Sequence, residues 1–476
     1  MKKILYIASE AMPFASTGGL ADVIGSLPIE VAKEGVDVRV VMPLHSSVKQ
    51  EYRDQMKDVV EYHLPLSWRK QYCGIKMLDY KGVKFYFIDN EYYFARDKVY
   101  GNFDDGERFA FFSLAAIDML GVIGFYPDVI NANDWQSALS IVYLERKYRQ
   151  IEGYENIRTV FSIHNIEYQG KYDMAILGDV FGLLESDRGI VEYDGCINLM
   201  KAAIVCADRV VTVSPRYSGE ICTSEYGSGL ESVLLEHRYK LMGILNGIDY
   251  EYYNPSEDKE IKRNYTWRSA ARKVENKLAL QREVGLVERA DAPLISIISR
   301  LVSHKGIDLV AEMVYNLLEN NDVQLVVLGL GEAKYEQLFV ELEEKFKGRV
   351  AALITYDRDT SKRIYSASDI FLMPSKSEPC GLSQMIASRY GAIPVVRETG
   401  GLADSIKGFW LNGDTICGNG FTFANYSAGE LYERTVAAVA LWNDLPLRTK
   451  FVSKIMRTDF SWKNSAKKYL TLYETL

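Results

Sequence analysis

Short apolar runs alternate with amphipathic stretches along the first half of this sequence. Runs of strand length, rich in branched and aromatic side chains, occupy residues 4–8, 36–42, 85–88, 129–132, 159–163 and 209–213, and a further run at 241–245 leads into the turn signal Asn246-Gly247. Residues 21–33 and 109–120, which lie between such runs, have a helical amphipathic pattern. Strands that alternate with helices build a parallel sheet covered on both faces. The pattern predicts a doubly wound, Rossmann-like α/β domain.

The same alternation starts again in the second half. Five further buried-strand runs lie at 294–299, 324–328, 350–354, 370–373 and 393–396, and a polar segment with helical propensity, 254–289, separates the two series. Residues 449–476 are expected to form one or two helices, with Phe460-Ser461-Trp462 as a cap and restart. We therefore predict an N-terminal domain over 1–248 and a second Rossmann-like domain over 249–455. Two such domains in tandem would face a central cleft, a common site for small ligands.

Composition narrows the class of protein. The chain has 476 residues, a formal charge of −8, 48% hydrophobic and 25% charged residues, and no apolar run of membrane-spanning length. The acidic balance argues against a nucleic-acid surface. Six scattered cysteines without a CxxC pair predict reduced thiols, with neither disulfides nor a zinc site. We expect a cytoplasmic protein that binds neither membrane nor nucleic acid.

Three polar motifs follow expected strands of the first domain. Ser16-Thr17-Gly18-Gly19 precedes a helix, so that two glycines could let the backbone approach an anionic ligand; a tight strand-to-helix turn is the plainer explanation. Asn133-Asp134-Trp135-Gln136 follows the run 129–132, and His164 to Gly170, which includes Tyr168, follows the run 159–163. Ligands bind at the carboxyl ends of parallel strands, and amide, imidazole and aromatic groups there suit a sugar.

The second domain carries charged groups at the corresponding positions. Arg300 and Lys305 follow the run 294–299, and a forked guanidinium with a point charge is a common pair for a diphosphate, although a solvated basic loop is the alternative. Glu378 lies in the turn Ser375–Gln384 after the run 370–373. The turn Thr399-Gly400-Gly401-Leu402 follows the next strand and could admit a phosphate. Together these motifs predict a nucleotide-sugar pocket.

Two further patterns are weak. Gly329-Leu330-Gly331 is an incomplete dinucleotide fingerprint and is better explained as a turn after a strand. Asp357-Arg358-Asp359 matches the DxD pattern that binds metal in some glycosyltransferases, but the pattern is common by chance. No histidines and cysteines have zinc spacing. We therefore expect neither a metal nor a cofactor.

Taken together and in this order, the motifs resemble those of the bacterial glycogen synthases and plant starch synthases. The resemblance covers essentially the whole chain. It includes further motifs at Tyr100-Gly101, Asp104–Phe109, Thr212–Pro215, Tyr226–Glu231, Asn246–Asp249 and Gly418–Phe421. The resemblance implies the GT-B fold, two Rossmann-like domains, and a helix at 456–476 that packs back on the first domain. It also implies transfer of glucose, with retention, from ADP-glucose, sometimes UDP-glucose, to the non-reducing end of an α-1,4-glucan or maltooligosaccharide.

Residue roles follow from the same resemblance. Glu378, Arg300, Lys305 and His164 would be catalytic; the donor would contact Gly18, Gly19, Asn246, Tyr356, Cys380, Gly381, Leu382, Thr399, Gly400 and Gly401; and the acceptor would lie near Asp134, Trp135, Gln136 and Tyr168. A glycosidase that retains configuration needs two nearby carboxylates. Since only Glu378 is well placed, we expect attack from the face of the leaving phosphate, which helps to deprotonate the acceptor hydroxyl.

The sequence departs from the family pattern at four positions. Ser16 replaces a lysine, Asn133 and Gln136 replace histidines, and Ser377 replaces an aromatic residue. A unit charge pair at ~4 Å is worth roughly 4 kcal/mol at an effective dielectric near 20, so the change at Ser16 could weaken donor binding or catalysis. Two alternatives therefore stay open. One is a glycosyltransferase with another donor or a small acceptor, and the other is a non-catalytic glucan-binding paralogue.

Overall fold

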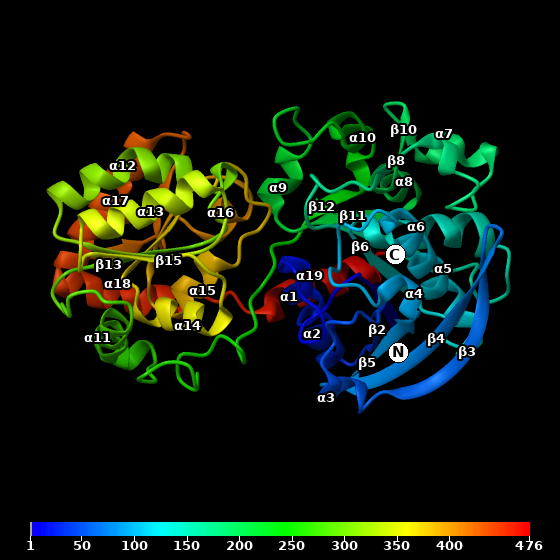
Figure 1. Cartoon of the computed structure of the whole chain (residues 1–476), viewed down its shortest axis with the longest axis horizontal. Helices are drawn as coiled ribbons and strands as arrows, with labels where there is room; N and C mark the ends of the chain where they lie inside the picture. The colour runs from blue at the N-terminus through cyan, green and yellow to red at the C-terminus, as the bar shows by residue number, and fades with distance from the viewer. Residues whose placement is uncertain (1) are drawn as a thin grey trace. The chain divides into compact units, whose positions relative to one another are not determined.

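The computed structural model describes residues 2–476, which divide into two compact units. Unit 1 comprises residues 2–247 together with Trp462–Leu476, and unit 2 comprises Ile248–Ser461. Each unit is a sheet between layers of helices (Figure 1).

A nine-stranded sheet forms the centre of unit 1, in the order β12-β11-β7-β6-β1-β2-β5-β4-β3. The first seven strands in this order run parallel, and β4 and β3 continue the sheet as an antiparallel hairpin. The strands are β1 Lys3–Ile7, β2 Asp37–Pro43, β3 Lys57–Leu66, β4 Arg69–Tyr80, β5 Val83–Asp89, β6 Val129–Asn133, β7 Arg158–Ile163, β11 Arg209–Thr212 and β12 Leu241–Gly243. Strand β1 pairs with β2 on one side and with β6 on the other. The strands that follow β1 in sequence are therefore added first on one side of it and later on the other, which makes the position beside β1 a topological switch point.

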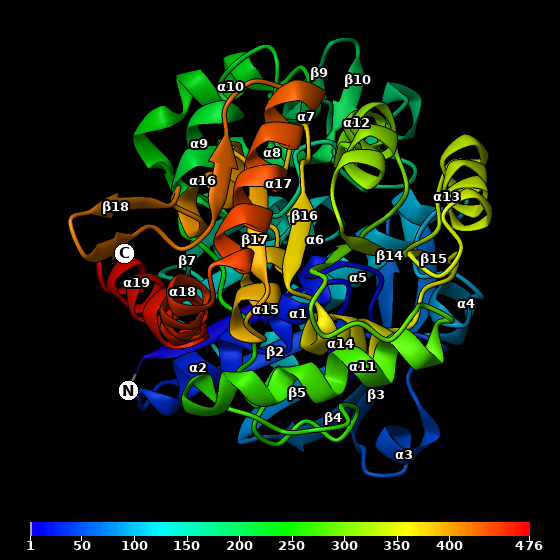
Figure 2. The ribbon, with the colours of Figure 1, turned by 90° about the vertical axis from the view of Figure 1, so that its left-hand side faces the viewer.

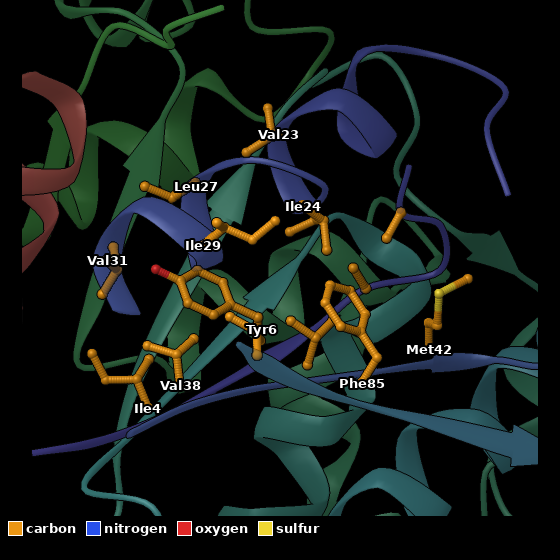
Figure 3. Packing of buried hydrophobic residues seen from close by; sticks show 14 of the residues in the cluster. Ile4, Tyr6, Val23, Ile24, Leu27, Ile29, Val31, Val38, Met42 and Phe85 are labelled. Atoms are coloured by element: carbon orange, nitrogen blue, oxygen red, sulfur yellow. The ribbon is translucent and has the colours of Figure 1, made fainter. Parts of the chain in front are cut away.

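Helices cover both faces of this sheet. They are α1 Gly19–Ile24, α2 Leu27–Lys33, α3 Gln50–Arg53, α4 Glu91–Phe94, α5 Asp105–Val122, α6 Trp135–Tyr143, α7 Arg188–Val191, α8 Leu199–Cys206, α9 Pro215–Glu220, α10 Glu231–Glu236 and α19 Trp462–Glu474. Alternate residues of β1, such as Ile4 and Tyr6, point into one core with Ile29 and Val31 of α2, as Figure 3 shows. This alternation is the period-two pattern of a strand, and burying it supplies much of the stability of the unit.

The C-terminal helix α19 belongs to the core of unit 1. Trp462, Ala466, Tyr469 and Tyr473 are buried in the same cluster as β1 and α2. The Tyr473 hydroxyl donates to Tyr6 Oη at 2.9 Å and accepts from Asn131 Nδ2 at 2.8 Å. Tyr473, which lies 467 residues after Tyr6 and 342 residues after Asn131, therefore links the C-terminal helix to two central strands.

Two features of unit 1 differ from the sequence prediction. The amphipathic stretch 21–33 forms two helices, because Pro28 disfavours a helix that continues through it and instead lies in the first turn of α2. Gly25 lies between the two helices, where a Cβ would be 2.7 Å from Met12 O. The hairpin β3–β4 and a small sheet of β8 Lys171–Tyr172, β9 Glu192–Tyr193 and β10 Cys196–Asn198 were not predicted. Much of β3 is exposed and polar, so it lacks the apolar run that identified the other strands.

Unit 2 contains a six-stranded parallel sheet in the order β15-β14-β13-β16-β17-β20. Its strands are β13 Leu294–Ile298, β14 Gln324–Leu328, β15 Val350–Leu353, β16 Ile370–Met373, β17 Ile393–Arg397 and β20 Phe421–Phe423. The first strand, β13, lies between β14 and β16, which both come later in the sequence. A second topological switch point therefore lies between β13 and β16.

The helices of unit 2 form a layer on each face. They are α11 Lys273–Glu283, α12 Ile307–Asn320, α13 Ala333–Lys345, α14 Arg358–Ala367, α15 Ser383–Arg389, α16 Gly400–Ser405, α17 Ala428–Asn443 and α18 Leu445–Arg457. A hairpin of β18 Trp410–Asn412 and β19 Thr415–Cys417 projects from the edge (Figure 2). Only the last part of the polar segment 254–289 is helical, with a short 3-10 helix at Trp267–Arg272 before α11.

Candidate active site

An ion pair lies at the switch point of unit 2. Lys305 Nζ is 2.6 Å from Glu378 Oε2, and the same oxygen accepts a hydrogen bond from Ser375 Oγ at 3.0 Å. Glu378 is buried, whereas Lys305 is partly exposed. A buried carboxylate is stable only when it is paired and hydrogen-bonded, so these two neighbours fix its position. Sequence analysis had singled out both charged residues but not Ser375.

The loops after β13 and β16 are held against each other by their backbones. Lys376 N donates to His304 O at 2.9 Å, and a Cβ at Gly306 would lie 2.3 Å from Pro374 O. Gly306 also has a φ of +77°, which favours glycine. Arg300 is exposed at the end of β13, with Nη2 3.2 Å from His304 Nε2. The two loops thus present a guanidinium, an ammonium and a carboxylate at one edge of the sheet.

The two glycines after β17, Gly400 and Gly401, are required by close packing within the protein. A Cβ at Gly400, where φ is +42°, would lie 2.0 Å from Glu378 O, and one at Gly401 would lie 2.1 Å from Cys380 O. Gly401 N donates to the carbonyls of Glu378 and Pro379, both at 3.1 Å. The glycines let this backbone pack against the Glu378 turn, so they do not by themselves indicate a phosphate.

Gln384 secures the other side of that turn. Its Nε2 donates to Cys380 O at 3.2 Å, Gly381 O at 2.9 Å and Ser405 Oγ at 2.9 Å. Its Oε1 is buried without a hydrogen-bond partner among residues 2–476. Leu382 lies at the N-cap of α15. Gln384 was not among the predicted site residues, because its importance follows from contacts that only the folded turn creates.

The remaining predicted residues of unit 2 differ in setting. The Tyr356 side chain is exposed after β15, where a planar ligand could stack on it. The weak DxD pattern has a structural explanation, since Asp357 Oδ2 accepts from Thr360 N at 2.7 Å and caps α14. Among residues 2–476, no three His, Cys, Asp or Glu side chains are grouped so that they could hold a metal ion.

In unit 1, His164 and its neighbours lie at the carboxyl ends of β6 and β7. His164 Nε2 is 2.9 Å from Asn133 Oδ1, and His164 N donates to Asp134 Oδ1 at 2.7 Å. Burial lowers the pKa of His164 to about 4, which keeps the imidazole neutral. Burial also raises the pKa of Asp134 to about 7, against the backbone amides that favour its charged form. Asp134 has an uncommon φ of +57°, and its carboxyl faces the backbone N–H of His164 at the start of the loop after β7.

The glycine loop after β1 is held by a residue that sequence analysis missed. Glu10 Oε2 accepts from Thr17 N at 2.5 Å and from Thr17 Oγ1 at 2.8 Å. Burial raises the pKa of Glu10 to about 7 despite these hydrogen bonds. A Cβ at Gly18 or Gly19 would meet nothing within 4 Å, and neither glycine has a positive φ. Among residues 2–476, no atom occupies the place of a Cβ at Gly18 or Gly19, so these exposed glycines leave room for a ligand to approach closely.

The predicted acceptor-side residues are not all available to a ligand. The Trp135 ring is buried, with centroids 5.4 Å from that of Phe109 and 6.1 Å from that of Tyr172, so it packs in the core beside the predicted acceptor side. Tyr168 is exposed. Gln136 Oε1 and Asn246 Oδ1 are buried and lack a hydrogen-bond partner among the described residues 2–476. Buried amide oxygens without partners are costly, and a ligand hydroxyl could satisfy them.

Comparisons with known proteins define the class first. Residues 3–236 match the family model of the starch synthase catalytic domain, and residues 283–452 match that of glycosyl transferases group 1. A sucrose-phosphate synthase structure from Thermosynechococcus elongatus shares the fold, with a TM-score of 0.61 at 16% identity over 100% of this chain and 99% of that one. With two Rossmann-like units, the chain is a glycosyltransferase of the GT-B architecture. The predicted fold class is confirmed.

The family follows from more similar proteins. The chain is 46% identical to a glycogen synthase of Clostridioides difficile over 100% of this chain and 99% of that one, and 44% identical to a glycogen synthase of Geobacillus thermodenitrificans over 100% and 98%. The catalytic domain of starch synthase IV from Arabidopsis thaliana, solved with ADP and acarbose, has a TM-score of 0.92 at 35% identity over 100% and 99%. The chain belongs to the glycogen and starch synthase family, which confirms the predicted resemblance. No helix among residues 2–476 is long and apolar enough to span a membrane.

Proposed function

We propose that this protein is a glycogen synthase that transfers glucose, with retention, from ADP-glucose to the non-reducing end of an α-1,4-glucan. The observation that carries the proposal is the group Arg300, Lys305 and Glu378 at the switch point of unit 2. Open parallel sheets bind their ligands there. Family membership, and the ADP and acarbose in the starch synthase IV structure, support the choice of donor and acceptor.

In this proposal the cations of unit 2 act on the leaving group. Cleavage of the bond between sugar and phosphate leaves negative charge on the diphosphate and positive charge on the anomeric carbon. Arg300 and Lys305 would stabilise the diphosphate as this charge develops, and so would lower the barrier more than they strengthen ground-state binding. Lys305 already stands fixed by Glu378, which removes part of the cost of ordering a long side chain at the moment of reaction.

Glu378 and the residues of unit 1 would contact the sugar. Glu378 would lie on the donor-sugar side, while Cys380, Gly381, Leu382, Thr399, Gly400 and Gly401 shape the turn that carries it, with Tyr356 near the base. Asn246, Gly18, Gly19 and His164 would contact the donor, and Asp134, Gln136 and Tyr168 would lie toward the acceptor. The buried amide oxygens of Gln136 and Asn246 can accept hydrogen bonds only, so each suits a sugar hydroxyl.

Retention in this proposal needs no covalent glycosyl-enzyme. Glu378 Oε2 accepts hydrogen bonds from Lys305 and Ser375, which lowers the nucleophilicity of that oxygen. The acceptor hydroxyl would attack from the face that the phosphate leaves, its proton passing to a phosphate oxygen. In this step the new glycosidic bond forms as the bond between the anomeric carbon and the phosphate oxygen breaks, and ADP leaves with the acceptor proton.

The experiment that tests the proposal offers the purified protein ADP-, UDP- or GDP-glucose, each with glycogen, with maltooligosaccharides or with no primer. Nucleotide release and chain extension are measured in parallel. We expect equimolar ADP release and extension with ADP-glucose and a primer. Binding of ADP-glucose without transfer to either primer would refute a synthase and leave a glucan-binding paralogue. Faster transfer from another nucleotide sugar would refute the donor.

A further inference from the structure

The side-chain amide of Asn133 can lie in only one orientation. Its Nδ2 is 3.2 Å from Ile7 O and 3.0 Å from Asn131 O. Both of these oxygens are backbone carbonyls, which accept hydrogen bonds and cannot donate them, so the NH₂ group must face them. The amide oxygen, Oδ1, therefore faces His164. Asn133 is buried and the neighbouring strand β1 supplies one of the carbonyls, so the orientation is set by the sheet itself.

This orientation determines which nitrogen of His164 carries the proton. Asn133 Oδ1 can only accept, and it lies 2.9 Å from Nε2, so Nε2 must be the N–H. In a neutral imidazole the other nitrogen, Nδ1, is then an acceptor. Nδ1 has no hydrogen-bond partner among residues 2–476, and this atom is not fully buried, so solvent or a ligand can reach it. Burial, which lowers the pKa of His164 to about 4, favours the neutral ring.

We propose that Asn133 is a positioning residue that holds His164 in the Nε2–H tautomer, so that Nδ1 accepts a hydrogen bond from a sugar hydroxyl. The assignment of a sugar to this site rests on the proposed function, whereas the tautomer does not. The family resemblance implies a histidine where this chain has Asn133. An amide fixed by two carbonyls cannot change its donor and acceptor atoms, whereas a histidine could change its own tautomer.

The first test is spectroscopic and does not need a substrate. Protein labelled with ¹⁵N at histidine is studied by NMR at about pH 8, where an unprotonated imidazole is expected, and the His164 signals are assigned with His164→Gln. We expect the nitrogen shifts of the Nε2–H tautomer in the wild type. In Asn133→Leu, which is similar in size but has no acceptor, we expect a mixture of tautomers. An Nδ1–H signal in the wild type would overturn the proposal.

Two further variants separate positioning from a structural role. Asn133→Asp loses the donors to Ile7 and Asn131 but keeps an acceptor toward Nε2, so it should retain the tautomer although it is less stable. Asn131→Leu removes a buried amide from the same strand that does not contact His164, and should also retain the tautomer. If Asn133→Asp and Asn133→Leu change the His164 spectrum alike, the residue has only a structural role and the proposal fails.

The second test uses ADP-glucose analogues in which one hydroxyl at a time is replaced by fluorine, which cannot donate. For one analogue we expect the wild type to lose about tenfold in kcat/KM, as for one lost hydrogen bond, and Asn133→Leu to lose clearly less. The ratio between the two proteins removes the intrinsic effect of fluorine. Equal losses for every analogue would overturn the role of Nδ1. If neither protein uses ADP-glucose, the proposed function fails while the tautomer result stands.

Discussion

Replacing Glu10 with glutamine should make unit 1 more stable at high pH and leave it nearly unchanged at low pH. Glu10 is buried, and its carboxylate accepts two hydrogen bonds from Thr17 beside the glycine loop. Burial is the largest cause of its raised pKa, and the nearby charge of Asp22 adds to it. Glutamine keeps an acceptor oxygen of the same shape but carries no charge, so it removes the cost of burying the ionised form.

The size of the effect follows from proton linkage. The pKa of Glu10 is raised from 4.5 to about 7. Between these values the unfolded chain has lost the proton while the folded protein keeps it, so folding stability falls as pH rises. The total loss is about 3 kcal/mol, of which roughly 2.5 kcal/mol falls between pH 5 and pH 8. His164 and His45, whose pKa values burial lowers to about 4, contribute the opposite slope below pH 6.5, while Asp134, whose pKa burial raises to about 7, contributes a slope of the same sign as Glu10.

The assay compares Glu10→Gln with the wild type by urea unfolding at pH 5 and pH 8, followed by circular dichroism. Taking the difference between the two proteins removes the contributions of the histidines and of unit 2. We expect the variant to gain about 2.5 kcal/mol relative to the wild type between the two pH values. Glu34→Gln, at an exposed position on the same unit, should show no such change. If the free energy of unfolding of Glu10→Gln differs from that of the wild type by the same amount at both pH values, Glu10 is not held protonated by burial.

Three further predictions concern the proposed site. Lys305→Met should lower kcat by a factor of about 10²–10³, since it removes charge that faces the leaving diphosphate. The double variant Lys305→Met/Glu378→Gln should recover stability in thermal unfolding but no activity, and recovered activity would contradict the role of the lysine. Gly400→Ala should destabilise unit 2 by about 2 kcal/mol or more, because its Cβ would lie 2.0 Å from Glu378 O. Gly18→Ala should leave the melting temperature unchanged and raise the KM for the donor, and the reverse pattern would contradict our explanation of these glycines. Ser16→Lys should raise kcat/KM for ADP-glucose severalfold in steady-state assays, and an unchanged value would show that this exposed position does not act on the donor.

The sequence predicted the parallel strands other than β20, because burial on both faces leaves a continuous apolar run, as in β16. It did not predict the hairpin β3–β4, whose solvent-facing residues dilute that signal. The sequence also cannot show which glycines are required by packing. Gly18 and Gly400 look equivalent in sequence, yet only Gly400 is required by contacts within the protein.

The site was predictable where one residue type at a strand end suffices. Lys305 and Glu378 follow neighbouring strands, so their proximity follows from the order of the sheet. Glu10 was missed because its significance depends on Thr17, which the loop brings back to it. Asn133 was identified only as a departure from the family, since the two carbonyls that orient its amide are known only from the folded sheet.

The central claim is that this chain adds glucose to a glucan with retained configuration. The most direct measurement is an NMR spectrum of glycogen or maltooligosaccharide after incubation with ADP-glucose that carries ¹³C at the anomeric carbon. We predict that the label appears as an α-1,4-linked glucosyl unit while ADP accumulates in equal amount. A β-linked product, or ADP release with the label found only in free glucose, would contradict it.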